Sequence, residues 1–521
     1  MRCQVIWYNT DTMPFYLRAK KLDFSSGGQP WVVILHEKEA MTFGVVLGDL
    51  IQVKWRGQRA IVVAYYTRKE VKQGEIGFFR EIWKQRDIKK GEPIALRVLS
   101  RPPSIEAIRK KLQGKSLTYK EMDSIIHDIV HHKLSNVEIT YFTASSFIKE
   151  FSREELYFMT KAIAENGEQI RLPSRVVADK HSVGGVAGNR TTMIVVPIVA
   201  SYGVFIPKTS SRAITSPAGT ADTMEVLAPV SFTLEKILPI IKKIKCCLIW
   251  GGSFRLAPAD DYIIRVSRPL ALEPLDKMVV SIMAKKVATG ITHLVVDLPY
   301  GPTAKILNRQ IALDVKKKFK YLAKRFGIKI EVVLSETREP IGRGIGPALE
   351  ARDVLRVLQQ KDYRPADLEK KAVKLAGKLL ELCGRAKKGQ GHMMAVEALT
   401  SGRAWKKMKE IVKSQGGNPR TDSEDLTLAA IRHRFHAPYS GKIVAVDDNM
   451  VDDIARILGA PHEKPAGIYI NKMLGQRVRR GERLFTLYAQ NQDRIDLALE
   501  ALKRKSIFKI EKMKVSEGRA G

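Results

Sequence analysis

The segment 178–192 combines lysine, hydroxyl and glycine residues at a spacing that could bind an anion. A β-type run leads into Lys180 and Ser182, three glycines follow, and an apolar run begins after Thr192. Glycines let the backbone approach a ligand closely, and the amides at a helix start favour an anion. Lys180 supplies a positive charge, while Ser182 and Thr192 supply hydroxyl donors. These residue types predict an oxyanion site, with phosphate as the favoured anion.

Three separated motifs carry a resemblance to a known family. They read KHS-x-GG at 180–185, KTSSRAITS at 208–216 and GT at 219–220. Together with a long N-terminal extension, they resemble the thymidine phosphorylase family and, within it, its archaeal-type AMP phosphorylase branch. The resemblance spans roughly residues 85–510. It implies an α/β fold of the nucleoside phosphorylase class, with a helical domain and a larger mixed α/β domain.

The resemblance also implies which residues hold the substrates. The positions that match the family's phosphate ligands are Lys180, Ser182, Thr192, Ser210 and Thr220. One ammonium group and four hydroxyls would form a polar cage in which no carboxylate competes with the anion. The positions that match nucleotide contacts are Gly185, Ser211, Arg212, Ala213, Ile214, Thr215, Ser216, Thr220, Ser281 and Lys305.

Two cations favour a substrate that carries its own phosphate. Arg212 offers a planar fork suited to a phosphate or a carboxylate. Lys305 is expected at the C-terminal end of a strand, where open α/β sheets bind ligands. Ser281 and Lys285 match the base-side serine and lysine of the nucleoside enzymes, but the arginine expected before them aligns poorly here. That departure counts against a pyrimidine nucleoside as the substrate.

The family's general acid corresponds to Glu273, where relatives of the AMP phosphorylase branch carry aspartate. Burial would raise the pKa of this carboxyl group and keep it protonated near neutral pH. Alternatively, Glu273 only caps the helix that follows it. The general acid would then be Asp276 or one of the pair Asp260-Asp261. His181 could face the base or simply pack.

The reaction implied is AMP plus phosphate giving adenine and ribose 1,5-bisphosphate, as a step of nucleotide salvage. Phosphate is already anionic and must only be positioned, while the departing base needs a proton or a hydrogen-bond donor. We expect no cofactor and no metal, and inorganic phosphate would be a co-substrate. The nearest alternative is a thymidine or other pyrimidine-nucleoside phosphorylase. An anthranilate phosphoribosyltransferase-like enzyme and a non-enzymatic RNA-binding protein are further alternatives.

Composition fits a cytoplasmic globular protein. The 521 residues are 45% hydrophobic and 28% charged, with no signal-peptide layout and no membrane-spanning apolar run. The four cysteines lack metal-type spacing and are expected to be buried thiols. Lysine and arginine number 89 against 55 acidic residues, a net charge of +34. This surplus either steers phosphorylated substrates or reflects a solvated basic surface. We expect a homodimer or larger homo-oligomer, and no specific nucleic acid or membrane as partner.

Four regions would position these residues. Residues 1–100 contain short β-like runs and predict a small barrel or sandwich. Residues 104–167, joined by about 259–290, predict a helical domain, with capping boxes starting at Thr118, Ser135 and Ser152. Residues 173–427 alternate strand and helix, including a parallel βαβ unit between 294 and 334. Residues 428–521 predict a small α+β C-terminal subdomain. His127 and His131 could suit a metal, but a helix-surface role is favoured.

Overall fold

The computed structural model describes residues 15–26, 31–99, 102–213, 216–267 and 275–512. The chain divides into two compact units. The first comprises residues 1–167 and 257–281, and the second comprises 168–256 and 282–521. No helix in the described ranges is long and apolar enough to cross a membrane.

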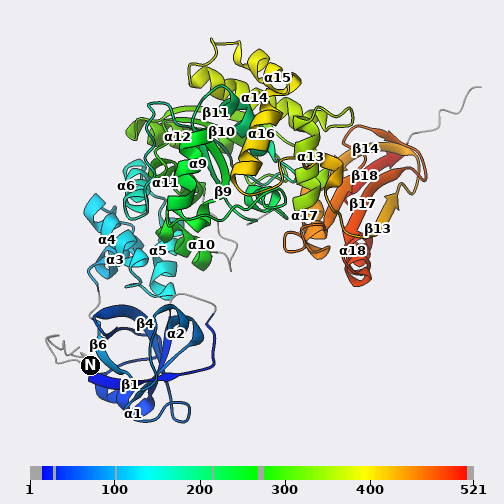
Figure 1. Cartoon of the computed structure of the whole chain (residues 1–521). Helices are drawn as coiled ribbons and strands as arrows, with labels where there is room; N and C mark the ends of the chain where they lie inside the picture. Colours follow the sequence, from blue (N-terminus) through cyan, green and yellow to red (C-terminus); the bar gives the residue numbers. More distant parts are fainter. Residues whose placement is uncertain (1–14, 27–30, 100–101, 214–215, 268–274, 513–521) are drawn as a thin grey trace, which may run out of the picture. The chain divides into compact units, whose positions relative to one another are not determined.

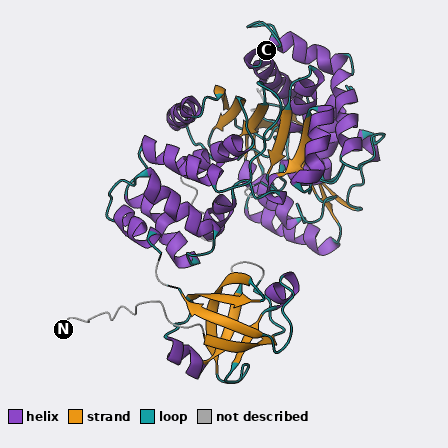
Figure 2. Ribbon diagram, turned by 60° about the vertical axis from the view of Figure 1, so that its left-hand side comes forward, coloured by secondary structure: helices purple, strands orange, loops and turns teal. Residues whose placement is uncertain are grey.

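The N-terminal part of the first unit is a closed barrel of β-strands (Figure 2). Its six strands follow the order β1-β5-β2-β4-β3-β6. Alternate side chains of its strands are buried and fill the interior, as expected where one sheet face lines a core. The strands are β1 (Phe15–Lys21), β2 (Val32–His36), β3 (Leu50–Trp55), β4 (Gln58–Thr67), β5 (Glu75–Phe78) and β6 (Pro93–Val98). Two short helices accompany them, α1 (Glu37–Phe43) and α2 (Arg80–Gln85).

Helices make up the remainder of the first unit. Thr118, Ser135 and Ser152 each close the predicted capping box with the glutamate three residues later. Lys111 pairs with Glu155 at 2.8 Å, and both side chains are almost fully buried. The helices are α3 (Ser104–Leu112), α4 (Tyr119–Val130), α5 (Asn136–Ile148), α6 (Arg153–Glu165), α10 (Pro258–Ser267) and the start of α11 (Leu275–Ala288).

The centre of the second unit is a parallel sheet in the order β11-β10-β7, made of β11 (Lys329–Glu336), β10 (His293–Tyr300) and β7 (Ala178–Ser182). The parallel pair β8 (Ile206–Ser210) and β9 (Cys246–Trp250) adjoins it through a bridge between Val177 and Phe205. The predicted βαβ unit is confirmed as β10, α12 (Arg309–Arg325) and β11. The predicted fold class is therefore confirmed.

Helices pack against this sheet and against one another (Figure 1). Helix α7 (Thr191–Ser201) is apolar and buried on almost every side, so it forms the middle of the core. The others are α8 (Thr220–Met224), α9 (Leu234–Ile244), α13 (Pro347–Leu358), α14 (Ala366–Leu382), α15 (Gly391–Thr400) and α16 (Arg403–Ser414).

The C-terminal subdomain has its own hydrophobic core and two small antiparallel sheets. One sheet has the order β12-β15-β17-β13, the other β16-β14-β18. Strand β12 (Gly344–Ile345) precedes residue 428, so an earlier part of the chain completes this sheet. The other elements are β13 (Ile431–His436), β14 (Gly441–Val446), α17 (Asp448–Ile457), β15 (Gly467–Ile470), β16 (Arg477–Val478), β17 (Arg483–Ala489), α18 (Gln492–Arg504) and β18 (Phe508–Lys512).

Candidate phosphate and nucleotide site

The predicted phosphate lysine lies at the C-terminal end of β7 and is fully buried. Its Nζ donates to Thr191 Oγ1 at 2.7 Å and to Thr192 Oγ1 at 3.2 Å, at the start of α7. Burial lowers the pKa of Lys180 to about 7, and Asp297 opposes that shift. The structure thus brings Lys180 and Thr192 together at a helix N-terminus, an arrangement suited to an anion.

The Ser182 hydroxyl binds a carboxylate that the sequence did not predict as its neighbour. Its hydroxyl donates to Asp297 Oδ2 at 2.6 Å, because the two residues are register partners on β7 and β10. Lys371 and Ser335 also bind Asp297, at 3.0 and 3.1 Å. Burial raises the pKa of Asp297, but Lys371 and Lys180 outweigh it and hold the pKa at about 2. The expectation that no carboxylate stands in the cage is wrong, because Asp297 is part of it.

The glycines of the first motif allow two close backbone approaches. Gly185 has φ +77°, and a Cβ there would lie 2.6 Å from the Lys305 amide nitrogen. Gly188 has φ +68°, and a Cβ there would lie 2.3 Å from the Ile341 carbonyl oxygen. Only glycine tolerates both the left-handed conformation and these approaches. The structure therefore places the predicted residues Gly185 and Lys305 against each other.

A second group of predicted residues follows strand β8. The Ser210 hydroxyl is buried and has no hydrogen-bond partner among the residues that the structure describes. A buried hydroxyl of this kind is costly unless a ligand or water satisfies it. Gly219 packs against this segment, since a Cβ there would lie 2.5 Å from the Ser211 carbonyl oxygen. Ser210 and Ser211 thus lie beside the turn that leads to Thr220, the first residue of α8.

Arg212 is held by carboxylates. Its guanidinium donates to Glu225 at 2.7 and 2.8 Å and to Asp222 at 3.1 Å, and it lies 4.9 Å from the centre of the Trp250 ring. Glu225 also pairs with Lys464 at 3.1 Å. The bond from Arg212 lowers the pKa of Glu225 to about 2. Protein carboxylates therefore bind the guanidinium that the sequence predicts to contact a nucleotide.

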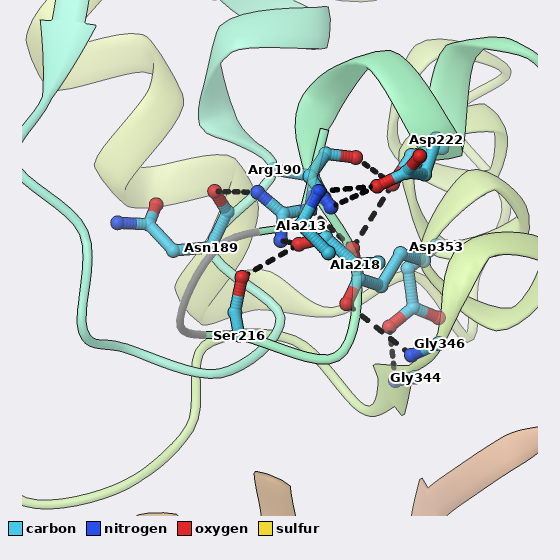
Figure 3. A network of polar contacts seen from close by, with 12 residues as sticks. Asn189, Arg190, Ala213, Ser216, Ala218, Asp222, Gly344, Gly346 and Asp353 are labelled. Carbon is cyan, nitrogen blue, oxygen red and sulfur yellow. Dashed lines mark hydrogen bonds and ion pairs between the residues drawn. The ribbon is translucent and has the colours of Figure 1, made fainter. Parts of the chain in front are cut away.

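Arg190 links the start of α7 to the segment that follows β8 (Figure 3). It precedes α7 and donates to the Ala218 carbonyl oxygen, and it pairs with the buried Glu350. The Ser216 hydroxyl donates to the same Ala218 oxygen at 2.7 Å. Asp222 accepts from the backbone amide of Ala213 at 2.7 Å. The start of α7 and the predicted nucleotide loop therefore form one polar network.

A third buried cluster lies beside Lys180. Asp179 binds Lys208 Nζ at 3.1 Å and Lys286 Nζ at 2.5 Å. Burial, helped by these lysines and Lys180, lowers the pKa of His181 well below its ordinary value, so its imidazole is neutral. A neutral histidine can donate or accept a hydrogen bond but adds no charge to the site.

The predicted acid Glu273 lies outside the described residues, as do Ile214 and Thr215. Of its alternatives, Asp260 and Asp276 are buried in the first unit. Asp260 accepts a hydrogen bond from the predicted base-side Ser281 at 2.7 Å. Asp260 therefore orients the Ser281 hydroxyl within that unit.

Among the described residues, no group of three or more His, Cys, Asp or Glu side chains could hold a metal ion. His127 and His131 stack on each other, with ring centres 4.0 Å apart. Cys246, Cys247 and Cys383 are buried free thiols. What the second unit offers is a compact arrangement of buried cations, hydroxyls and helix-start amides, which can bind and orient an oxyanion.

Family models match three parts of the chain. Residues 105–167 match the family model of the glycosyl transferase family, helical bundle domain, and residues 174–405 match that of the glycosyl transferase family, a/b domain. Residues 443–509 match the pyrimidine nucleoside phosphorylase C-terminal domain. Anthranilate phosphoribosyltransferase from Thermus thermophilus has the same fold over 59% of this chain and 99% of its own, with a TM-score of 0.51 and 19% identity.

Relatives match nearly the whole chain. AMP phosphorylase from Pyrococcus furiosus is 40% identical over 95% of this chain and 98% of its own length. AMP phosphorylase from Methanococcus vannielii is 39% identical over 96% of this chain and 98% of its own. The chain therefore belongs to the thymidine phosphorylase family and, within it, to the AMP phosphorylase branch.

Proposed function

We propose that this protein catalyses the phosphorolysis of nucleoside 5′-monophosphates, with AMP and phosphate giving adenine and ribose 1,5-bisphosphate. The observation that carries the proposal is Lys180, an ammonium group buried at the start of α7 where, among the described residues, only hydroxyls accept its hydrogen bonds. A buried cation costs free energy unless an anion compensates it. The names of relatives that match nearly the whole chain support AMP as the second substrate.

In the proposed reaction, phosphate attacks C1′ and the bond from C1′ to the base nitrogen breaks. Lys180 and the hydroxyls of Thr192 and Ser210 orient the phosphate, so that its negative charge stabilises the cationic sugar that develops at C1′. The electron pair of the broken bond stays on the base nitrogen. Glu273, as the general acid, gives that nitrogen a proton or a hydrogen bond.

A pyrimidine-nucleoside phosphorylase is the second candidate, and one observation favours it. Glu225 and Asp222 occupy the Arg212 guanidinium, whose role in the first candidate is to contact a nucleotide. A nucleoside has no 5′-phosphate and needs no free arginine. If AMP is the substrate, its 5′-phosphate replaces Glu225 on Arg212 or binds beside it, with Lys305 as the other cation.

The test is phosphate-dependent release of base from AMP, CMP, UMP, adenosine and thymidine. Release from monophosphates but not from nucleosides supports the proposal. Turnover of nucleosides alone favours the second candidate and removes the nucleotide roles of Arg212 and Lys305. A Glu273→Gln variant should lose most of the activity, whereas an Asp276→Asn variant should retain it if Glu273 is the acid.

We further propose that the enzyme is a cytoplasmic homodimer or larger homo-oligomer and needs no cofactor. Helix α5 supports self-association, since it exposes Val137, Tyr141 and Ile148. The buried thiols fit a reducing compartment. Sedimentation equilibrium tests the oligomeric state. Activity that survives dialysis against EDTA supports the absence of a metal requirement, and loss restored by Mg²⁺ contradicts it.

A further inference from the structure

The loop 301–306 between β10 and α12 is fixed at its base. The Gly301 amide donates to the Ile306 carbonyl oxygen at 2.9 Å, and the Ala304 amide donates to the Gly301 carbonyl oxygen at 3.2 Å. A Cβ at Gly301 would lie 2.0 Å from the Thr337 carbonyl oxygen, so the backbone at Thr337 fits closely against the loop. The loop is short and tight, and it carries Lys305.

This loop touches the phosphate motif through its backbone. The Lys305 amide nitrogen is the atom that a Cβ on Gly185 would meet at 2.6 Å, with Lys305 Cγ at 2.9 Å. Two backbones this close cannot move independently. A shift of loop 301–306 therefore moves Lys305 and displaces the glycine turn that follows Lys180.

A carboxylate of the C-terminal subdomain holds the same loop. Asp448, the first residue of α17, is 2% exposed, and its Oδ2 accepts a hydrogen bond from Thr303 Oγ1 at 3.2 Å. Its Oδ1 is buried and has no hydrogen-bond partner among the residues that the structure describes. Burial, with further contributions from Glu339 and Asp447, raises the pKa of Asp448 to about 7.

Asp448 lowers the stability of the folded protein. A buried carboxyl group with one bond to a neutral hydroxyl costs more free energy than an apolar side chain of similar size. Its hydrogen-bond partner Thr303 lies 145 residues earlier in the sequence, in the loop that carries Lys305. A function of this hydrogen bond in the substrate site would explain why a residue with this free-energy cost is present.

We propose that Asp448 is a positioning residue, which acts through Thr303 to hold loop 301–306 in the place that substrate binding requires. The C-terminal subdomain then contributes to binding of AMP and phosphate through the contact of Asp448 with the loop. This inference rests on the proposed function, because it assigns Lys305 and the Gly185 turn to the substrates. It adds a residue that the family motifs in this chain do not include.

The test compares Michaelis constants with turnover numbers. Asp448→Ala and Thr303→Val should each raise KM for AMP and phosphate by about 5- to 10-fold, the worth of one hydrogen bond, with kcat changed by less than about 2-fold. Asp448→Asn keeps an acceptor oxygen and should retain the KM of the unmodified enzyme. Asp452→Asn, one turn further along α17, is the matched control and should change neither constant.

A double variant separates this role from a general loss of stability. If the two residues act as a pair, Asp448→Ala with Thr303→Val should bind substrate no worse than the single variants. Additive effects, or an Asp448→Asn variant as impaired as Asp448→Ala, would overturn the inference. If the unmodified enzyme does not cleave AMP with phosphate, the proposed function fails. Phosphate affinity by calorimetry then decides whether Thr303→Val weakens the site, and an unchanged affinity overturns the inference as well.

Discussion

At the scale of single residues, the site depends on a lysine placed where it costs stability. Lys180 is fully buried, and no carboxylate lies within 4 Å of its Nζ among the described residues. Its pKa of about 7 lies below its ordinary value, so the unfolded chain binds more protons above pH 7. The stability that burial takes away is therefore regained as pH rises through about 7 to about 10. Phosphate binding would compensate the charge below that range.

Replacing this lysine should separate stability from function. Lys180→Met removes a buried charge but keeps most of the apolar stem of the side chain, so the free energy of unfolding should stay the same or rise. The kcat/KM for phosphate should fall about 100- to 1,000-fold, because a preorganised cation is lost. Urea unfolding and initial rates measure the two effects. Lys329→Met, on the exposed side of β11, is the control, and unchanged phosphate use in Lys180→Met would refute the assignment.

The pH profile should report Asp297. Its negative charge raises the pKa of Lys180, so Asp297→Asn should lower that pKa further. If phosphate binds the protonated lysine, the decline of kcat/KM toward alkaline pH should begin at lower pH in the variant. Ionisation of phosphate itself is the same for both proteins and cancels in the ratio of their profiles. Superimposable profiles would mean that Lys180 does not control phosphate binding.

At the scale of elements, two neighbouring glycines have different tasks. Gly184 and Gly185 both have positive φ, but no described atom lies within 4 Å of a Cβ placed at Gly184. At Gly185, the Lys305 backbone fills that space. Gly184 is thus required only by its left-handed backbone conformation. Gly185 is required by that conformation and by its close packing against the Lys305 backbone.

This difference gives a matched pair of variants. Gly184→Ala should cost about 1–2 kcal/mol in unfolding free energy, from the left-handed conformation alone. Gly185→Ala should cost at least about 1 kcal/mol more, because Lys305 must move to make room. It should also lower kcat/KM for AMP by about 10- to 100-fold through misplacement of the loop. Equal stability of the two variants, measured by urea unfolding without substrate, would show that the backbone contact carries no energy.

At the scale of the whole molecule, the sequence predicts what depends on local pattern. The capping glutamates place helices α4, α5 and α6, and the apolar strands with a helix between them give β10-α12-β11. The anion site at the start of α7 could be predicted from the motif at 180–185, because its glycines and hydroxyl residues lie close together in the sequence. Asp297 was missed although it follows the apolar strand residues 294–296, where carboxyl ends of parallel strands carry functional groups.

Other features depend on contacts that the sequence does not indicate. The partners of Arg212 lie 10 and 13 residues further along the chain, and nothing in their spacing shows that they face it. The two-residue strand β12 forms only because β15 pairs with it. The role of Glu273 as the acid stays a prediction.

The net charge of +34 should act on substrate capture. Raising monovalent salt from about 0.02 M to about 0.5 M should lower kcat/KM for AMP severalfold, since it screens attraction between a basic protein and an anion. The thermal stability of the protein should change much less. Salt-independent kinetics would instead favour a basic surface with no part in catalysis. Salt-sensitive RNA binding without any turnover would favour the RNA-binding alternative.

Labelled inorganic phosphate tests whether phosphate is the nucleophile at C1′. The enzyme is incubated with AMP and isotopically labelled inorganic phosphate, and adenine and the labelled sugar phosphate are quantified together. We expect one labelled phosphoryl group in ribose 1,5-bisphosphate for each adenine released, and no adenine when phosphate is omitted. Adenine released without incorporation of label would mean that water is the nucleophile, and that result would contradict a phosphorylase built around Lys180.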